Sequence, residues 1–304
     1  MGLGAKRTRT DTASRVTSVL LGAHVSTTGG IHTAIDRIEA LGGEAVQVFT
    51  QSPRAWRPTN HDPANIERFR ERRLEAGIGA VVCHAVYLVN LASPDDTVYE
   101  KSIAALVNAV EVGCAIEADG VVVHVGSHLG AGLDAGLERA VPALRRALQA
   151  CSDTTWLLLE NSAGAGGTIG RSVDELAVLV DALDRHPRLG LCLDSCHLWV
   201  SGVDVTERAV LDATLASVDE RIGLERLRVL HVNDADAGLG SNRDRHANVG
   251  AGELGEQLGV FLGHPTLQGL PALLEVPGQN GKGPDADEVR KLRELHGRWA
   301  AARA

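Results

Sequence analysis

Eight short apolar runs alternate with longer amphipathic segments along the whole chain, and no other feature restricts the fold as much. The runs are typical of buried strands and span residues 18–25, 44–50, 80–86, 120–126, 156–161, 189–195, 227–233 and 271–276. The segments between and after them fit helices at 29–41, 62–76, 95–117, 132–151, 172–185, 206–219, 253–263 and 285–302. Asp62, Ser93 and Ser172 are expected to cap three of these helices.

Strand–helix units that repeat without a break in composition predict one α/β domain, a (β/α)8 TIM barrel over residues 16–304. A doubly wound sheet is the main competitor, but its ligand site usually draws on fewer strand ends. In the barrel, polar groups at the carboxyl ends of all strands meet at one mouth.

Composition limits the class of protein. Apolar residues make up 44% of the 304 residues and charged residues 23%, which is enough for a large core. No apolar run approaches the roughly 18 residues of a membrane span. Residues 1–15 are basic, without the apolar stretch of a secretory signal, and are expected to be a disordered tail, with weak DNA binding as the alternative. We therefore expect a cytoplasmic protein; a monomeric state and, if the source is a bacterium, association with the nucleoid are further expectations that composition does not decide.

The charged and sulfur-containing residues narrow the partners further. A net charge of −9 argues against a broadly basic nucleic-acid-binding surface but leaves a local one open. Of the 30 basic residues, 26 are Arg, which suits phosphate contacts. The five cysteines include no CxxC pair and are expected to be reduced thiols. A zinc thiolate at Cys196 is the alternative.

Metal-ligating side chains stand where the apolar runs end. Charge buried at a strand tip is costly unless it is paired, so a set of such groups predicts a shared ion site. Seven groups end or follow strands and two more lie in a loop motif, DRH: His84, His124, Glu160, Asp194, His197, His231 and Glu275, then Asp244 and His246. Together they predict a multinuclear metal centre at the carboxyl ends of the strands, with zinc the best match and manganese or iron as alternatives.

Each of these residues alone has an ordinary interpretation, because a single strand-end His is more often a hydrogen-bonded core residue. His24 ends the first run and is expected beside the ligands. His128 could orient a ligand or touch phosphate.

The glycines at 250–255 match GxGxxG, but no strand is expected to run into them, so dinucleotide binding is not expected. The glycine-rich stretch at 164–167 is expected to be a mobile loop near the site.

Longer motifs carry a family resemblance. GAHVSTTGG, QVFTQSPRAW, HAVYLVNLAS, HVGSH, LLLENSAG, CLDSCH, LHVNDA, DRHANVGAGELG and LLEVPG resemble the endonuclease IV family of apurinic/apyrimidinic (AP) endonucleases. The resemblance runs from about residue 20 to residue 280. That family shares a barrel superfamily with xylose isomerase-like enzymes.

The resemblance implies three divalent metal ions, typically zinc, with manganese at some positions. His84, His124 and Glu160 would hold the first ion. Glu160 would bridge to the second ion and act as the catalytic carboxylate. Asp194, His231 and Glu275 would complete the second site, and His197, Asp244 and His246 would hold the third.

The resemblance also implies a reaction and a partner. Double-stranded DNA would be cut at the phosphodiester 5′ to an abasic site, leaving a 3′-hydroxyl and a 5′-deoxyribose phosphate. Arg54, Tyr87 and Leu88 match positions that enter the DNA, although a Tyr-Leu pair alone is more often core packing. Arg243 and Arg245 flank Asp244 and are expected to contact phosphate. Val125 departs from the family's usual Pro, which puts the substrate range in doubt rather than the core reaction.

Two other functions remain open. A sugar or hydroxy-acid isomerase on the same barrel needs only Glu160, Asp194, His231 and Glu275, and leaves the other five groups unused. A non-catalytic zinc-binding or damage-binding protein fits the ligands, but not a bridging carboxylate.

Overall fold

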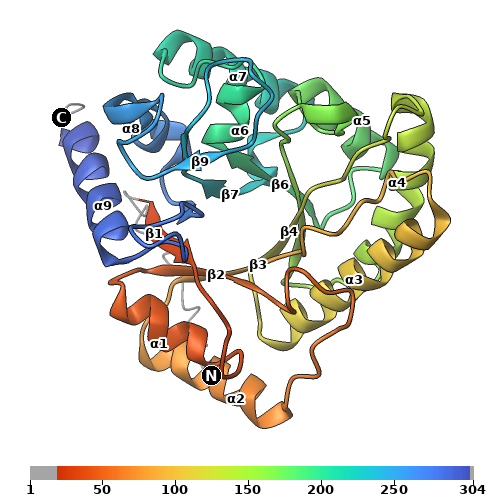
Figure 1. The fold of residues 1–304 in the computed structure, drawn as a ribbon, viewed down its shortest axis with the longest axis horizontal. Coiled ribbons are helices and arrows are strands. Elements are labelled where there is room, and N and C mark those ends of the chain that lie inside the picture. The colour runs from red at the N-terminus through yellow and green to blue at the C-terminus, as the bar shows by residue number, and fades with distance from the viewer. Residues whose placement is uncertain (1–18, 302–304) are drawn as a thin grey trace, which may run out of the picture.

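The computed structural model describes residues 19–301, which form a closed barrel of eight parallel strands surrounded by helices (Figure 1). The order around the barrel is β1-β10-β7-β6-β5-β4-β3-β2, so consecutive strands are neighbours and the last one pairs with the first. Leu20 opposite Pro271 begins that closing register. The predicted (β/α)8 barrel is confirmed. The tail expected at residues 1–15 lies outside the described residues.

The barrel strands lie inside the predicted runs and are four to six residues long. They are β1 (Leu20–His24), β2 (Ala45–Phe49), β3 (Ala80–His84), β4 (Gly120–Val123), β5 (Trp156–Glu160), β6 (Leu189–Asp194), β7 (Leu227–His231) and β10 (Pro271–Leu274). A separate antiparallel pair, β8 (Asp234–Ala235) and β9 (His246–Ala247), follows β7 and was not predicted.

Eight helices occupy the predicted segments and form the outer ring in Figure 1. They are α1 (Thr33–Ala40), α2 (Pro63–Glu75), α3 (Asp96–Ala115), α4 (Leu133–Leu148), α5 (Val173–Ala182), α7 (Arg208–Arg221), α8 (Leu258–Leu262) and α9 (Ala286–Ala301). A ninth, α6 (Ser195–Val200), begins directly after β6. None of the helices within residues 19–301 is long and apolar enough to cross a membrane.

Two of the three predicted helix caps are confirmed. Asp62 accepts a hydrogen bond from the backbone N–H of Ala64, and Ser172 accepts one from Glu175. The prediction for Ser93 was wrong, because Asp95 caps α3. The Ser93 hydroxyl instead accepts a hydrogen bond from the backbone N–H of Asp95, and this bond stabilises the turn that leads into the helix.

The core has two layers because strand side chains alternate between the barrel interior and the helices. The large outer layer packs the helices on the strands. The small inner layer comprises Ala45, Ala80, Val82, Val122, Leu158, Cys192, Val229 and Leu273. Any residue two positions beyond one of these inner residues also faces inward, closer to the carboxyl mouth.

Candidate metal centre

Strand alternation carries six polar side chains to the inner mouth of the barrel. Each stands two residues after an inner-layer residue: Gln47, His84, His124, Glu160, Asp194 and His231. Glu275 follows Leu273 in the same way, just beyond β10. The pattern that builds the apolar interior therefore also positions most of the candidate site.

Glu160 lies at the centre of this cluster and is fully buried. Its Oε2 atom is 3.2 Å from His84 Nε2 and 3.1 Å from His124 Nε2. Its Oε1 atom faces the other way, 2.9 Å from His231 Nδ1 and 3.3 Å from His197 Nδ1. The two carboxylate oxygens thus serve two separate groups of imidazoles, which is the arrangement of a bridging ligand.

A second group gathers around the Nδ1 atom of His231. Beyond Glu160, this nitrogen is 3.4 Å from Glu275 Oε2 and 3.9 Å from Asp194 Oδ2. Three carboxylates from β5, β6 and the end of β10 therefore converge on one imidazole nitrogen. Oxygen atoms that only accept hydrogen bonds repel one another in this arrangement unless protons or a cation lie between them.

A third group forms where α6 meets β9. His197 Nε2 is 3.3 Å and His246 Nε2 is 3.5 Å from Asp244 Oδ1. Both imidazole nitrogens are buried without a hydrogen-bond partner. Two buried nitrogens that face one carboxylate oxygen without a hydrogen bond fit the donor set of a cation site, since buried polar atoms are normally satisfied. Asp244 and His246 of the DRH segment therefore point to the same side of the chain.

The start of α6 explains the Asp194-x-x-His197 spacing. The Asp194 carboxylate caps this helix by accepting the backbone N–H of His197 through Oδ1 at 2.8 Å. Its Oδ2 atom stays near the neighbouring group, 3.8 Å from His246 Nε2. The cap of this helix thus fixes the orientation of the Asp194 carboxylate and places His197, one turn later, beside it.

The electrostatics of the cluster favour a cation. Burial opposes charge on Glu160, but the nearby imidazoles, His124 and His231 above all, hold its pKa well below the usual range. Burial by itself lowers the pKa of His197, yet the carboxylates of Asp194 and Asp244 raise it well above the usual range. Carboxylates and imidazoles held this close favour a positive charge between them, which a proton or a divalent ion can supply.

Possible metal-binding groups recur throughout this cluster. His84, His124 and Glu160 form one, His84, His231 and Glu275 another, and Asp194, His197 and His246 a third. Their ligand atoms are imidazole nitrogens and carboxylate oxygens, the donor set that suits zinc. All nine side chains predicted as ligands lie in this one cluster.

Cys196, the alternative thiolate ligand, lies beside this cluster and forms a possible metal-binding group with Asp244 and His246. Its thiol is buried, which raises its pKa, and it donates to the carbonyl oxygen of Arg245 at 3.7 Å. Burial likewise raises the pKa of Cys192, which lies near His231, to about 12. Burial thus favours the neutral thiol over the thiolate form that binds a metal.

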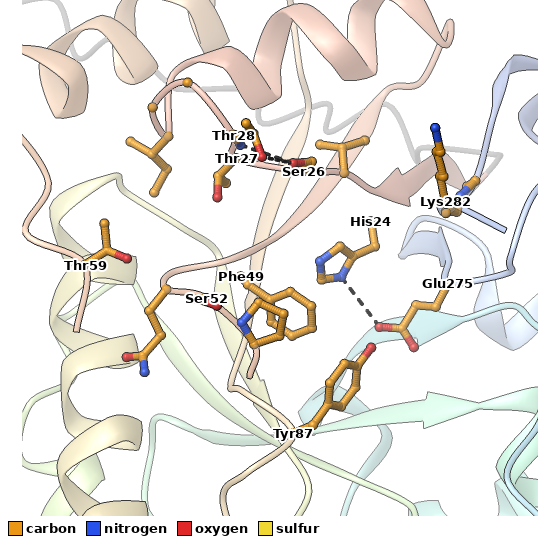
Figure 2. Close-up of a pocket in the computed structure, with 18 of the residues that line it drawn as sticks. His24, Ser26, Thr27, Thr28, Phe49, Ser52, Thr59, Tyr87, Glu275 and Lys282 are labelled. Carbon is orange, nitrogen blue, oxygen red and sulfur yellow. Dashed lines mark hydrogen bonds and ion pairs between the residues drawn. The ribbon is translucent and has the colours of Figure 1, made fainter. Parts of the chain in front are cut away.

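His24 and His128, the two histidines expected near the ligands, have different surroundings in the structure. His24 lies beside the cluster, with Nδ1 3.8 Å from Glu275 Oε1 (Figure 2). His128 has a structural role, because its Nδ1 atom accepts the backbone N–H groups of Gly130 and Gly132. The ring of His128 therefore shapes the loop after β4.

Three buried amides hold the cluster and were not predicted. Gln47 contacts both His231 and Glu275. Asn233 donates to Asp194 Oδ2 at 2.7 Å and accepts the Glu275 N–H. The Asn161 amide donates to the backbone carbonyl oxygen of Asp194 and accepts a hydrogen bond from its backbone N–H. Gln47 and Asn233 continue the alternation of inward-facing residues, and Asn161 stands directly after β5. These positions were the only indication of the three amides in the sequence.

Two neighbouring cavities open above the cluster. A cavity of about 320 Å³ is lined by ligand candidates, Tyr87 and Arg245. A second, of about 650 Å³, lies between the loops after β1 and β2 and shares Tyr87 and Glu275 with the first. Figure 2 shows this second cavity, with hydroxyl groups along one wall and Phe49 and Tyr87 beside Glu275. The pair forms a continuous surface that reaches from the candidate metal centre onto the surrounding loops.

The predicted DNA-contacting residues lie around this mouth. Tyr87 is 68% exposed and rests edge-on against Phe49, which excludes core packing for its ring. Leu88 is half-buried and packs on the core. Arg54, Arg243 and Arg245 follow strand ends in exposed loops, and Arg245 donates to the carbonyl of Asp244.

The GxGxxG segment has a structural explanation. The backbone N–H groups of Gly252, Leu254 and Gly255 all donate to the buried carboxylate of Asp234 at 2.9–3.2 Å. The glycines therefore wrap the chain around an acidic side chain, and the strand before them is the two-residue β9, which lies outside the barrel sheet. This agrees with the expectation that the segment is no dinucleotide fingerprint.

Comparison with known proteins gives the family. Residues 35–296 match the family of xylose isomerase-like TIM barrels. A protein of Methanoculleus marisnigri named probable endonuclease 4 is 40% identical over 281 residues, covering 92% of this chain and 99% of its own. The crystal structure of endonuclease IV from Thermus thermophilus matches with a TM-score of 0.80 at 36% identity, covering 93% of this chain and 99% of that one.

More distant barrels share only the fold. The structure of a D-tagatose 3-epimerase-like protein matches with a TM-score of 0.66 at 18% identity over 92% of this chain and 97% of its own. Sequence identity and TM-score both favour the endonucleases, and the predicted family resemblance is confirmed. The chain belongs to the endonuclease 4 family of xylose isomerase-like TIM barrel enzymes.

Proposed function

We propose that this protein is a metal-dependent AP endonuclease that acts on double-stranded DNA. It hydrolyses the phosphodiester 5′ to an abasic site and leaves a 3′-hydroxyl and a 5′-deoxyribose phosphate. The observation that carries this proposal is the position of Glu160, whose two oxygens face separate groups of imidazoles at the mouth of the barrel. The similarity to proteins named endonuclease 4 supports the same reaction class.

The proposed centre holds three divalent ions, with zinc favoured and manganese as the alternative. His84, His124 and Glu160 would hold one; Glu160, Asp194, His231 and Glu275 the second; His197, Asp244 and His246 the third. When bound, such ions supply a nucleophile at neutral pH and neutralise charge on the attacked phosphate and the leaving oxygen. The unpartnered nitrogens of His197 and His246 support the third position.

The remaining side chains bind and orient the DNA. Tyr87, exposed above the centre, would stack where the missing base leaves a gap, and Leu88 would support it from below. Arg54 lies in the loop after β2, on the same rim as Tyr87. Arg243 and Arg245 would hold the backbone phosphates beside Asp244. The chemistry requires no protein nucleophile.

The domain boundaries, the oligomeric state and the location in the cell are part of the same proposal. Residues 16–304 would act as one catalytic domain, and the protein would work as a monomer in the cytoplasm, near the nucleoid in a bacterium. Those assignments stay predictions. The basic residues 1–15 lie outside the described part of the chain.

An isomerase is the second candidate, and the ligand surplus argues against it. Four carboxylate and imidazole ligands suffice for a single-metal sugar site, whereas nine candidates are gathered here. The likeness to epimerase structures concerns the barrel alone.

Incision of a defined oligonucleotide tests the proposal. A duplex with one tetrahydrofuran abasic analogue should be cut once, 5′ to the analogue, by zinc-loaded protein, while the matched intact duplex stays whole. Turnover of ketose sugars with no incision by the same metal-loaded preparation would replace the endonuclease with the isomerase.

A further inference from the structure

Gln47 is a fully buried amide in the middle of β2, and it contacts three groups of the candidate metal centre. Its Nε2 atom donates to Glu275 Oε1 at 2.6 Å and lies 3.0 Å from His24 Nδ1. Its Oε1 atom lies 2.8 Å from His231 Nε2. A buried polar residue in an otherwise apolar strand therefore joins β1, β7 and the segment after β10.

The chemistry of these partners fixes the direction of the amide. An ionised carboxylate can only accept hydrogen bonds, so the NH2 end of Gln47 must face Glu275. The carbonyl end then faces His231 and can only accept. When the His231 ring is neutral, as a metal ligand must be, its single proton is therefore held on Nε2.

Holding that proton on Nε2 frees the opposite nitrogen. The Nδ1 lone pair of His231 then points at Glu160 Oε1, 2.9 Å away, and at Glu275 Oε2, 3.4 Å away. This is the place where the second cation of the proposed centre would sit. The same amide also fixes which oxygen of Glu275 remains available, because Oε1 already accepts the Gln47 donor.

We propose that Gln47 is the positioning residue of the second metal site: it locks the His231 tautomer with Nδ1 as the ligand atom and turns Glu275 Oε2 toward the ion. This inference rests on the proposed metal centre. Partners that orient metal-bound imidazoles typically change metal affinity about 10- to 100-fold when they are removed. Gln47 lines neither of the two cavities above the centre, so it acts through its two neighbours and not on the substrate.

Metal binding by the full chain gives the test, with zinc and cobalt as the probes. Gln47→Met keeps the length of the side chain but removes both hydrogen-bonding ends. In competition with a chelator, one of the bound ions should be held about 10- to 100-fold more weakly, and the visible cobalt spectrum should change. Gln268→Met is the matched control. The partly buried amide of Gln268 donates to the carbonyl oxygens of Leu262 and His264, but it lies before β10, away from the candidate metal centre. It should bind metal as the unchanged protein does.

A second measurement needs no variant at this position. Long-range ¹H–¹⁵N correlation spectra of the zinc-loaded protein, with His231 assigned from its absence in His231→Gln, should show the proton on Nε2 and the ion on Nδ1. The opposite tautomer, or metal affinity in Gln47→Met equal to that of the Gln268→Met control, would overturn the inference. Because neither readout uses DNA, a protein that binds its ions this way but fails to cut abasic DNA would contradict only the proposed function.

Discussion

At the level of single residues, Tyr87 is the clearest case of an aromatic side chain placed for recognition instead of packing. It follows His84 by three residues, and its ring stands 68% exposed over the cluster. Tyr87→Ala should weaken binding to abasic duplex by about tenfold or more, because stacking on one ring contributes about 1–3 kcal/mol. Binding to intact duplex and the free energy of unfolding should change little. Fluorescence anisotropy with both duplexes measures the difference.

Leu88 provides the contrast, since it is half-buried against the core. Leu88→Ala should lower the free energy of unfolding by about 1–2 kcal/mol in urea titrations, through lost apolar burial. A stability equal to that of the unchanged protein would mean that Leu88 does not pack as the structure has it. A Tyr87→Ala variant that still distinguishes abasic from intact duplex would likewise remove Tyr87 from the recognition surface.

Glu160 supports a second prediction at this scale. Glu160→Gln keeps the shape of the side chain but halves its capacity as a bridging ligand, so incision should fall by about a hundredfold or more. Abasic duplex should still bind, because Arg54 and Tyr87 are exposed and their side chains remain in the variant. Incision and anisotropy on one preparation separate the two effects. Incision near the original rate would contradict the bridging role.

Most of the residue-scale site was predictable because its members are chemically distinctive and stand at strand ends. Gln47 was missed for the opposite reason. An amide inside an apolar strand has no motif of its own, and only the inner-layer alternation after Ala45 marks it. Asn161 and Asn233 were missed because the residue after a strand is usually part of an ordinary turn.

At the level of elements, strand positions were predictable because each barrel strand is buried on both faces and therefore appears as an apolar run. Short elements were not. α6 has six residues and begins where the predicted strand at 189–195 ends, which is too short a segment to show a helical period. Its start depends on Asp194 capping the His197 N–H, an interaction that only the folded chain displays. β8 and β9 are two residues each, too short for any periodicity.

The loop at 250–255 carries the element-scale prediction. A Cβ atom at Gly252 would lie 2.3 Å from the Ala235 carbonyl oxygen and 2.6 Å from Asp234 Oδ1. Gly252→Ala should therefore lower the free energy of unfolding by about 1–3 kcal/mol, because the backbone around Asp234 must move. Chemical denaturation provides the measurement.

Gly238→Ala is the matched control for this loop. A Cβ there meets nothing within 4 Å, so its effect should stay within about 0.5 kcal/mol. Equal losses in the two variants would mean that the close approach around Asp234 does not stabilise the loop.

At the level of the whole molecule, the cluster ties together strands that are far apart in sequence. β3 and β7 contribute imidazoles and β5 and the segment after β10 contribute carboxylates to one cluster, so an ion bound there would link all four segments. Removing divalent ions with a chelator should therefore lower the melting temperature by about 5–10 °C, the effect expected when a bound ion contributes a few kcal/mol. Restoring zinc should reverse the change in differential scanning calorimetry. An unchanged melting temperature would mean that no tightly held ion links these strands.

The most direct test is a crystal structure of zinc-supplemented protein with anomalous diffraction data collected at the zinc edge. The nine clustered side chains should surround three anomalous peaks, with Glu160 shared between two of them. Anomalous maps with no peak among these side chains, despite zinc in the crystals, would contradict the account at its centre.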